Sequence, residues 1–224
     1  GNCYWGNNAV VSGTLVLRNT NISTNNTSYG VSTAYSQYSG GTIELQGNVT
    51  VNGVLSTEGY DGINGYSINK GHLKVTSGNN FVKKFRVYGG YNSGATGTIS
   101  AGAGLKTDNL YAYNLFSNGQ GWNIQCSMFV HGALKLTGEY SPTNGCTVIY
   151  NGGYFEASSL KSYSSSGVTY EGKIVWNSGA QVQINGTCRK ATSGGDVTVR
   201  GNDRITTNPV SGGSCSKADF ITKL

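Results

Sequence analysis

Two short stretches near the start of the chain decide the fold: Gly13-Thr14-Leu15-Val16-Leu17 and Gly41-Thr42-Ile43-Glu44-Leu45. Each has a glycine followed by aliphatic residues at its third and fifth positions. This period of two places both aliphatic side chains on one face, which is typical of a half-buried β-strand. The leading glycine is expected to permit the backbone turn that starts the strand. The pattern returns at Gly71, Gly97, Gly132, Gly172 and Gly195, and the copy at Gly97 is weaker than the others.

Further segments between these repeats predict secondary strands at 48–51, 81–88 and 180–184. Asparagine and glycine both tolerate the positive φ that tight turns require, so Asn-Gly pairs predict turns. These pairs are Asn52-Gly53, Asn64-Gly65, Asn118-Gly119, Asn144-Gly145, Asn151-Gly152 and Asn185-Gly186.

Two architectures fit strands of this kind. One is an all-β, right-handed parallel β-helix, in which each coil of short strands stacks on the next. The other is an antiparallel β-sandwich or jelly roll, because Asn-Gly is a strong hairpin signal; an interlocked trimer is a third arrangement. The recurring pattern favours the β-helix. We expect one β-rich domain over residues 1–212 and a capping tail at 213–224, because the open end of a stack presents unpaired backbone groups.

The composition excludes several classes of protein. Only 12% of the 224 residues are charged and 35 are glycine, so long helices are disfavoured. The 15 Tyr, 6 Phe and 3 Trp can bury enough area for folding, which argues against disorder. No apolar run approaches the roughly 18 residues that a spanning helix needs, so no membrane insertion is expected. The net charge of +6 comes from scattered residues, so no nucleic-acid partner is expected.

The five cysteines form no CxxC pair, so no metal site of the usual spacing is expected, and no cofactor is implied. Cys146 with Cys188, or Cys3 with another cysteine, could form a disulfide in an oxidising compartment. Because the chain begins with glycine, we expect a processed product or a piece of a longer protein.

Candidate catalytic residues are few. A glycosidase needs two facing carboxylates, and the closest acidic pair in the sequence is Glu58 and Asp61. These two residues are the acid and base of an alternative function, a polysaccharide-degrading hydrolase or lyase. The sequence around them favours a solvated loop that contains an Asp-Gly turn over this catalytic interpretation. His72 and His131 are expected to be ordinary surface or turn residues.

Aromatic residues in or beside Gly/Asn-rich segments are the most informative feature of the sequence. Tyrosine and tryptophan offer stiff contact surfaces with a polar tip, and neighbouring Asn, Ser and Gly supply adaptable hydrogen bonds. This mixture indicates recognition of polar ligands such as sugars, although the same rings could stack between coils or line a subunit interface. The ligand-contact candidates are Tyr60, Tyr66, Tyr88, Tyr91, Tyr111, Tyr113 and Trp122.

The low charge, the Gly/Asn/Ser/Thr/Tyr bias and the glycine-led strands resemble the tips of fibrous adhesins. The similarity is to phage tail-fibre and tailspike receptor-binding regions and to phage-derived fibre tips on bacterial surfaces. It spans most of residues 13–205 and is compositional, so no family site is carried over. The resemblance implies a rigid, homotrimeric extracellular rod whose loops bind host surface glycans without catalysis. A structural, self-assembling surface fibre without a ligand is the remaining alternative.

Overall fold

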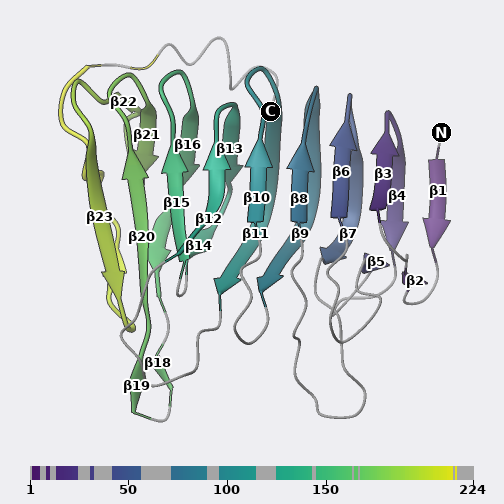
Figure 1. The fold of residues 1–224 in the computed structure, drawn as a ribbon, viewed down its shortest axis with the longest axis horizontal. Helices are drawn as coiled ribbons and strands as arrows, with labels where there is room; N and C mark the ends of the chain where they lie inside the picture. The colour runs from purple at the N-terminus through teal and green to yellow at the C-terminus, as the bar shows by residue number, and fades with distance from the viewer. Residues whose placement is uncertain are drawn as a thin grey trace.

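The computed structural model is a right-handed parallel β-helix, which confirms the predicted fold class (Figure 1). In Figure 1 the parallel strands in front run upward and those behind run downward while the chain advances from right to left, which is a right-handed winding. No membrane-spanning helix occurs in the described part of the chain. The structure describes residues 2–5, 9–10, 14–24, 31–32, 42–56, 72–89, 96–114, 125–142, 145–162, 164–165, 167–213 and 215.

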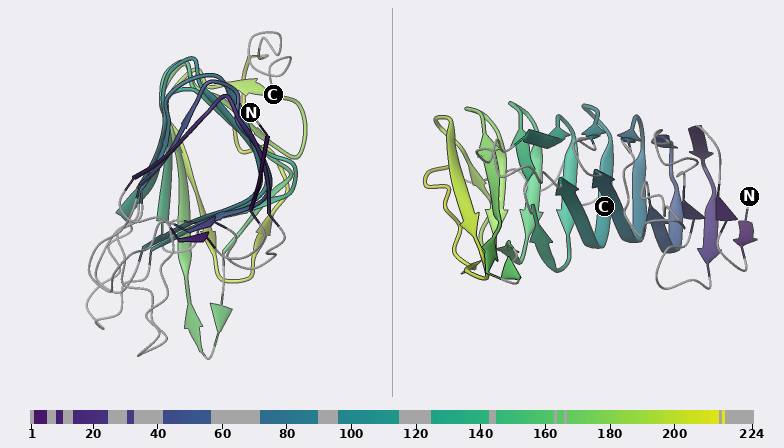
Figure 2. Two further views of the ribbon diagram at one scale, coloured as in Figure 1. Left: turned by 90° about the vertical axis from the view of Figure 1, so that its right-hand side faces the viewer. Right: turned by 60° about the horizontal axis from the view of Figure 1, so that its bottom comes forward.

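Each coil contributes strands to three faces of a triangular prism, seen end-on in Figure 2 (left). The first face contains the parallel strands β3 (Thr14–Arg18), β6 (Thr42–Gln46), β8 (His72–Val75), β10 (Thr96–Ile99), β12 (Gln125–Val130), β15 (Gly145–Ile149) and β20 (Glu171–Trp176).

The second and third faces share three long strands that bend from one face to the other. The second face contains β1 (Asn2–Trp5), β4 (Asn21–Thr24), the first parts of β7 (Thr50–Ser56), β9 (Asn79–Gly89) and β11 (Gly104–Asn114), and then β13 (Ala133–Leu136), β16 (Tyr154–Ala157) and β21 (Gln181–Ile184). The third face contains β2 (Ala9–Val10), β5 (Val31–Ser32), the later parts of the long strands, β14 (Glu139–Ser141) and β17 (Ser159–Lys161). A small hairpin of β18 (Ser164–Ser165) and β19 (Val168–Thr169) follows β17.

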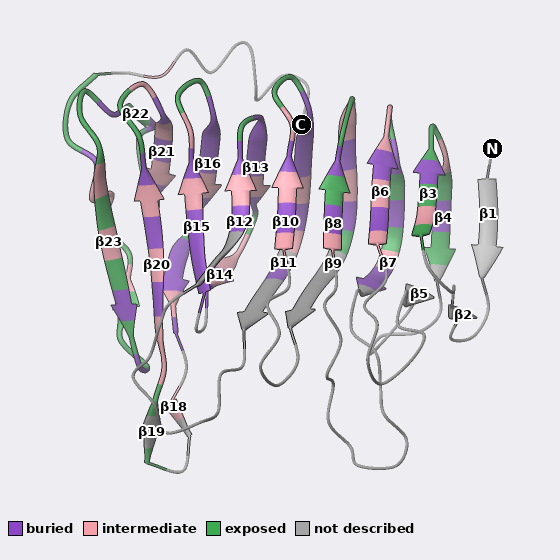
Figure 3. Cartoon of the chain, in the orientation of Figure 1, coloured by how far each residue is buried: buried purple, intermediate pink, exposed green. Residues whose placement is uncertain are grey.

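The core is built from columns of buried side chains that point into the prism. Successive first-face strands pair in register, so equivalent aliphatic residues stack from coil to coil, and buried and less buried residues alternate along the strands (Figure 3). One column of buried residues consists of Leu17, Leu45, Val75, Ile99, Val130, Ile149 and Trp176. Each coil therefore shields the apolar side of its neighbours.

Most of the glycine-led repeats occupy the first face, as a stacked fold requires. The copies that begin at Gly13, Gly41, Gly71 and Gly172 supply β3, β6, β8 and β20. The copy at Gly132 instead supplies β13, which lies on the second face.

The weak copy at Gly97 is wrongly aligned, because β10 begins one residue earlier, at Thr96. Gly97 pairs with Leu73 on one side and Met128 on the other. A Cβ atom at this position would collide with the sulfur of Met128, so this glycine makes room for a neighbouring side chain in the core.

The glycines that lead two other repeats also fill a different role from the predicted one. Gly132 and Gly172 are not among the residues with positive φ. A Cβ atom at Gly132 would collide with the carbonyl oxygens of Ser100 and Ala103, and one at Gly172 with that of Pro142. Glycine is needed here because the backbones of adjacent coils approach closely.

Asparagines connect successive coils at the corner between the first and second faces. The Oδ1 atom of Asn19 accepts a hydrogen bond of 2.9 Å from the backbone N–H of Asn48. Asn48 Oδ1 in turn accepts one of 3.1 Å from the N–H of Asn79. The side chain of the next residue, Asn80, is buried and donates to the Gly104 carbonyl at 3.1 Å.

The C-terminal end of the stack is closed by a reversal of the chain. After Asn185 and Gly186, which have φ values of 40° and 151°, the chain runs back around the last coil. The reversed strands are β22 (Arg189–Lys190), β23 (Gly195–Arg200) and β24 (Arg204–Ile205), which pair antiparallel with β21, β20 and β17 respectively. The repeat at Gly195 is therefore a strand of opposite direction that covers the end of the core. Of the predicted capping tail, only Gly213 and Cys215 are among the described residues.

The structure confirms some of the other predicted strands and turns and not others. The segment 81–88 falls within β9 and 180–184 largely within β21, but only the second half of 48–51 falls within β7. Asn151-Gly152 and Asn185-Gly186 lie in turns, but Asn52-Gly53 lies inside β7, where the pairing with β9 shifts register. Asn64-Gly65, Asn118-Gly119 and Asn144 lie outside the described residues.

We expect Gly132→Ala to lower the free energy of unfolding by about 1–3 kcal/mol, because overpacking forces the two coils apart. Urea denaturation measures the change. Thr198→Ala, at an exposed position of β23, is the control and should change stability by no more than about 0.5 kcal/mol. Equal stability of the Gly132→Ala variant and the parent would contradict close backbone approach at this position.

Candidate functional site

The three longest connections of the β-helix, and the shorter one between β9 and β10, cross one edge of the prism, where the third face ends and the first face begins. They join β5 to β6, β7 to β8, β9 to β10, and β11 to β12. We call this the variable edge. The strand ends that flank these connections lie in successive coils, along the lower side of the body in Figure 1.

Most of the predicted contact residues belong to these connections. Tyr60 and Tyr66 fall between β7 and β8, Tyr91 between β9 and β10, and Trp122 between β11 and β12. These four residues lie outside the described residues, as do Glu58 and Asp61, which precede β8. The flanking strands nevertheless attach the segments that carry them to the same edge, in neighbouring coils.

The remaining three predicted tyrosines lie in the strands that lead to this edge. Tyr88 in β9 pairs in register with Tyr113 in β11, and Tyr111 pairs with Arg86. Their backbone positions are therefore adjacent on the third face, and their side chains lie outside the described part of the structure. Sequence reasoning named these residues but did not predict that they pair.

A row of neutral hydrogen-bonding side chains begins the first face on the other side of the variable edge. Thr42, His72 and Thr96 are register partners in β6, β8 and β10, and all three are half-buried. His72 Nδ1 lies 2.5 Å from Thr96 Oγ1. Hydroxyl and imidazole groups can both donate and accept, so this row suits a ligand rich in hydroxyl groups.

The opposite corner, between the first and second faces, carries the second histidine. His131 is exposed there and stacks on the half-buried Tyr150, with ring centroids 4.0 Å apart and planes inclined by 9°. This pair lies away from the segments predicted to contact ligand.

Most of the described carboxylates brace neighbouring strands. They accept hydrogen bonds or form ion pairs in Glu44 with Thr76, Asp108 with Thr137, Glu139 with Arg204, Glu156 with Lys135, Glu171 with Arg200, and Asp196 with Lys173. Within the described ranges, no group of three His, Cys, Asp or Glu residues could hold a metal ion. The acid–base pair of Glu58 and Asp61 stays a prediction.

The disulfide joins Cys188 to Cys215, with Cα atoms 5.4 Å apart, so the predicted pairing of Cys146 with Cys188 is wrong. Cys188 follows β21 on the second face, whereas Cys146 is buried in β15 on the first face, in register with Cys126. The correct pairing depends on the chain reversal that follows β21, which has no counterpart in the repeat pattern.

Two fully buried tyrosines have strongly perturbed hydroxyl groups. Tyr140 packs edge-on against Phe155 in the core, and its hydroxyl lies 2.6 Å from Thr147 Oγ1. Burial raises the pKa of Tyr140. Burial also raises the pKa of Tyr154, and the hydrogen bond that its hydroxyl donates to Glu156 raises it further. Both phenols therefore stay protonated where an unfolded tyrosine ionises.

We expect the free energy of unfolding to fall as the pH rises above about 10, the ordinary pKa of tyrosine. Above that pH the unfolded chain binds fewer protons than the folded one, so unfolding is favoured. Urea denaturation at a series of pH values measures the slope. The double variant Tyr140→Phe/Tyr154→Phe should have a shallower slope; an identical slope would show that these two phenols do not cause the effect.

Comparisons with protein families, with curated proteins and with solved structures found no match for this chain. The case for a function therefore rests on the chemistry and placement of its own residues.

Proposed function

We propose that this protein is a non-enzymatic receptor-binding module, an adhesin tip of an extracellular fibre, that attaches a virion or a cell to host surface glycans. The variable edge is the proposed binding surface. The observation that carries the proposal is that the segments bearing Tyr60, Tyr66, Tyr91 and Trp122 are all attached to this edge. Tyr88 and Tyr113 pair in register beside it.

The chemistry of the edge suits a carbohydrate. Aromatic rings provide apolar surface for the faces of sugar rings, and their polar tips bind hydroxyl groups. The neighbouring row of Thr42, His72 and Thr96 adds neutral donors and acceptors. The net charge of +6 favours approach to anionic cell envelopes by electrostatic steering.

The scaffold also suits such a role. Columns of buried side chains in register hold the strand ends of adjacent coils at fixed spacing, so several connections can contact one extended ligand together. The disulfide supports an extracellular location, because such bonds persist in oxidising compartments.

We expect the double variant Tyr88→Ala/Tyr113→Ala to lose about 5- to 150-fold in affinity for the glycan that the parent protein binds best on a glycan array. Loss of two aromatic contacts, each contributing about 0.5–1.5 kcal/mol, has this magnitude. Tyr150→Ala removes a tyrosine at the opposite corner and should bind like the parent. An equal loss of affinity in both variants would contradict the proposal. So would a parent protein that binds neither any arrayed glycan nor whole target cells.

The same assay separates binding from degradation. The bound glycan should be recovered intact, and Glu58→Gln/Asp61→Asn should bind it like the parent. Release of shorter oligosaccharides by the parent but not by this variant would favour the alternative, a polysaccharide-degrading enzyme with these two carboxylates as acid and base.

We further propose that three copies associate, because several weak glycan sites on one particle bind together far more tightly than one site does. We expect native mass spectrometry to give three times the 23.5 kDa mass of one chain at micromolar concentration. A single-chain mass at all concentrations would contradict the trimer without affecting the glycan-binding proposal.

A further inference from the structure

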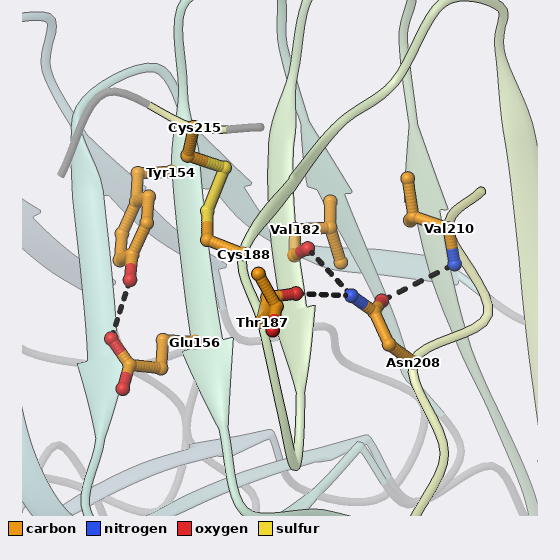
Figure 4. Close-up of a disulfide and its surroundings, with 8 residues drawn as sticks. All are labelled: Tyr154, Glu156, Val182, Thr187, Cys188, Asn208, Val210 and Cys215. Carbon is orange, nitrogen blue, oxygen red and sulfur yellow. Dashed lines mark hydrogen bonds between the residues drawn. A yellow bond between two sulfur atoms is a disulfide. The ribbon is translucent and has the colours of Figure 1, made fainter. Parts of the chain in front are cut away.

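A tyrosine on the outer side of the second face is completely buried. In β16, Phe155 and Ala157 belong to the main core, whereas Tyr154 belongs to a separate apolar cluster. This cluster contains Ala133 and Cys188, with Cys215 packed against it. Figure 4 shows Tyr154 beside the disulfide, with Glu156 further along the same strand. The outer surface of the second face is therefore covered at this point.

The cover on Tyr154 is the disulfide, which ends the strap, defined here as residues 206–213 together with Cys215. Asn208 Nδ2 donates to the Thr187 carbonyl at 2.9 Å and to the Val182 carbonyl at 3.4 Å, and Val210 packs into the end of the core (Figure 4). Beyond Val210, Gly212 and Gly213 are exposed, with φ values of 98° and 28°. The disulfide at Cys215 then fastens the strap over Tyr154.

The side chains around Tyr154 form a polar set. Tyr154 donates a hydrogen bond of 2.5 Å to Glu156 Oε2, and Lys135 Nζ lies 3.8 Å from the same oxygen. Gln181 is the register partner of Tyr154, and Gln183 that of Glu156. The charges of Lys135 and Glu156 offset each other, so a neutral ligand is favoured.

Two acceptor atoms in this set are unsatisfied. The Oε1 atoms of Gln181 and Gln183 are both buried, and neither has a hydrogen-bond partner. Buried polar atoms without partners are uncommon because they give up their bonds to water. A ligand that donates hydroxyl groups would satisfy both oxygens, while the ring of Tyr154 would contact its apolar face.

We infer that Tyr154, Glu156, Lys135, Gln181 and Gln183 form a second binding site for a neutral oligosaccharide, whose aromatic surface, the ring of Tyr154, is covered while the disulfide is intact. This site lies on the second face and does not depend on the function proposed for the variable edge. Reduction of the disulfide frees the strap beyond Val210 and uncovers the ring of Tyr154.

The opening step is a thiol–disulfide exchange with an external dithiol. One thiolate of the dithiol attacks the sulfur of Cys215, the less buried residue of the pair, and the Cys188 sulfur leaves as a thiolate and takes up a proton. The second thiol then attacks the mixed disulfide and releases Cys215 as a thiol. The protein gains two electrons and two protons, and the dithiol leaves as a cyclic disulfide.

The test uses the full chain and an array of neutral gluco-, manno- and galacto-oligosaccharides. Cys215→Ser and Cys188→Ser should each bind at least one of them about tenfold or more tightly than the oxidised parent, and dithiothreitol should give the parent the same gain. Adding Tyr154→Ala or Gln183→Ala to Cys215→Ser should abolish the gain. No gain in either cysteine variant, or a gain that survives both additions, would overturn the inference.

Matched controls separate this site from the variable edge and from unfolding. Cys215→Ser/Tyr150→Ala should keep the gain, because Tyr150 lies outside the strap. Cys215→Ser/Tyr88→Ala/Tyr113→Ala should also keep it, so a failure of the glycan site at the variable edge would leave this result unchanged. A urea-unfolding transition as cooperative as that of the parent shows that a variant is folded. A gain in affinity seen only in variants that lack such a transition would count against the proposed site.

Discussion

In-register stacking of inward side chains is the constraint on which this structure depends. A single coil exposes both sides of its apolar interior, so it is buried only when a coil lies on each side of it. Leu15 in the first described first-face strand is only partly buried, whereas its column neighbours Ile43 and Leu73 are 0% and 1% exposed. The reversed strands β22, β23 and β24 solve the same problem at the other end, since each covers the last strand of one face.

The same constraint determines where the chain is free to vary. The corner between the first and second faces is occupied by close backbone contacts, such as that of Gly132 with the coil before it, and by the Asn19–Asn48–Asn79 ladder. A change of length there would disturb the register of two faces. At the variable edge, the strands on either side are held by their neighbours, so connections of different length leave the register intact. The residues that we propose for glycan binding can therefore lie at this edge without weakening the core.

The parts of the fold that depend on residues close together in the sequence could be predicted. Period-two patterns such as Leu15 with Leu17 predict strands, and their recurrence predicts stacking. Strand direction is not local: the Gly195 repeat looks like the others, but the turn at Asn185-Gly186 sends it back along β20. The pairing of Cys188 with Cys215 depends on that same reversal.

The candidate site shows the same division. Composition identifies the aromatic residues, because rings beside Gly and Asn suit recognition whatever the fold. The segments that carry these residues are attached to the same edge because each coil contributes the same series of strands, and the number of strands in a coil is not evident from the sequence. Tyr88 and Tyr113 are separated along the chain and become neighbours only because β9 and β11 pair in register. The burial of Tyr154, by contrast, has no signal in the sequence, since it depends on a disulfide to a residue that follows the last coil.

The strap links the closure of the stack to the chemistry of its surface. A disulfide that spans 27 residues, as this one does, stabilises a fold by roughly 3–4 kcal/mol through loop-closure entropy. Leaving a buried acceptor without a partner costs about 1–3 kcal/mol, and the strand that pairs with Tyr154 and Glu156 carries two such atoms, Gln181 Oε1 and Gln183 Oε1. The two contributions are comparable in size and opposite in sign, so the covalent bond is large enough to keep the ring of Tyr154 covered against the hydrogen bonds that a ligand would give these acceptors. At the end of the stack, a coil is stabilised by a neighbour on one side only. A free-energy difference of this small size can therefore decide there between a covered and an open surface.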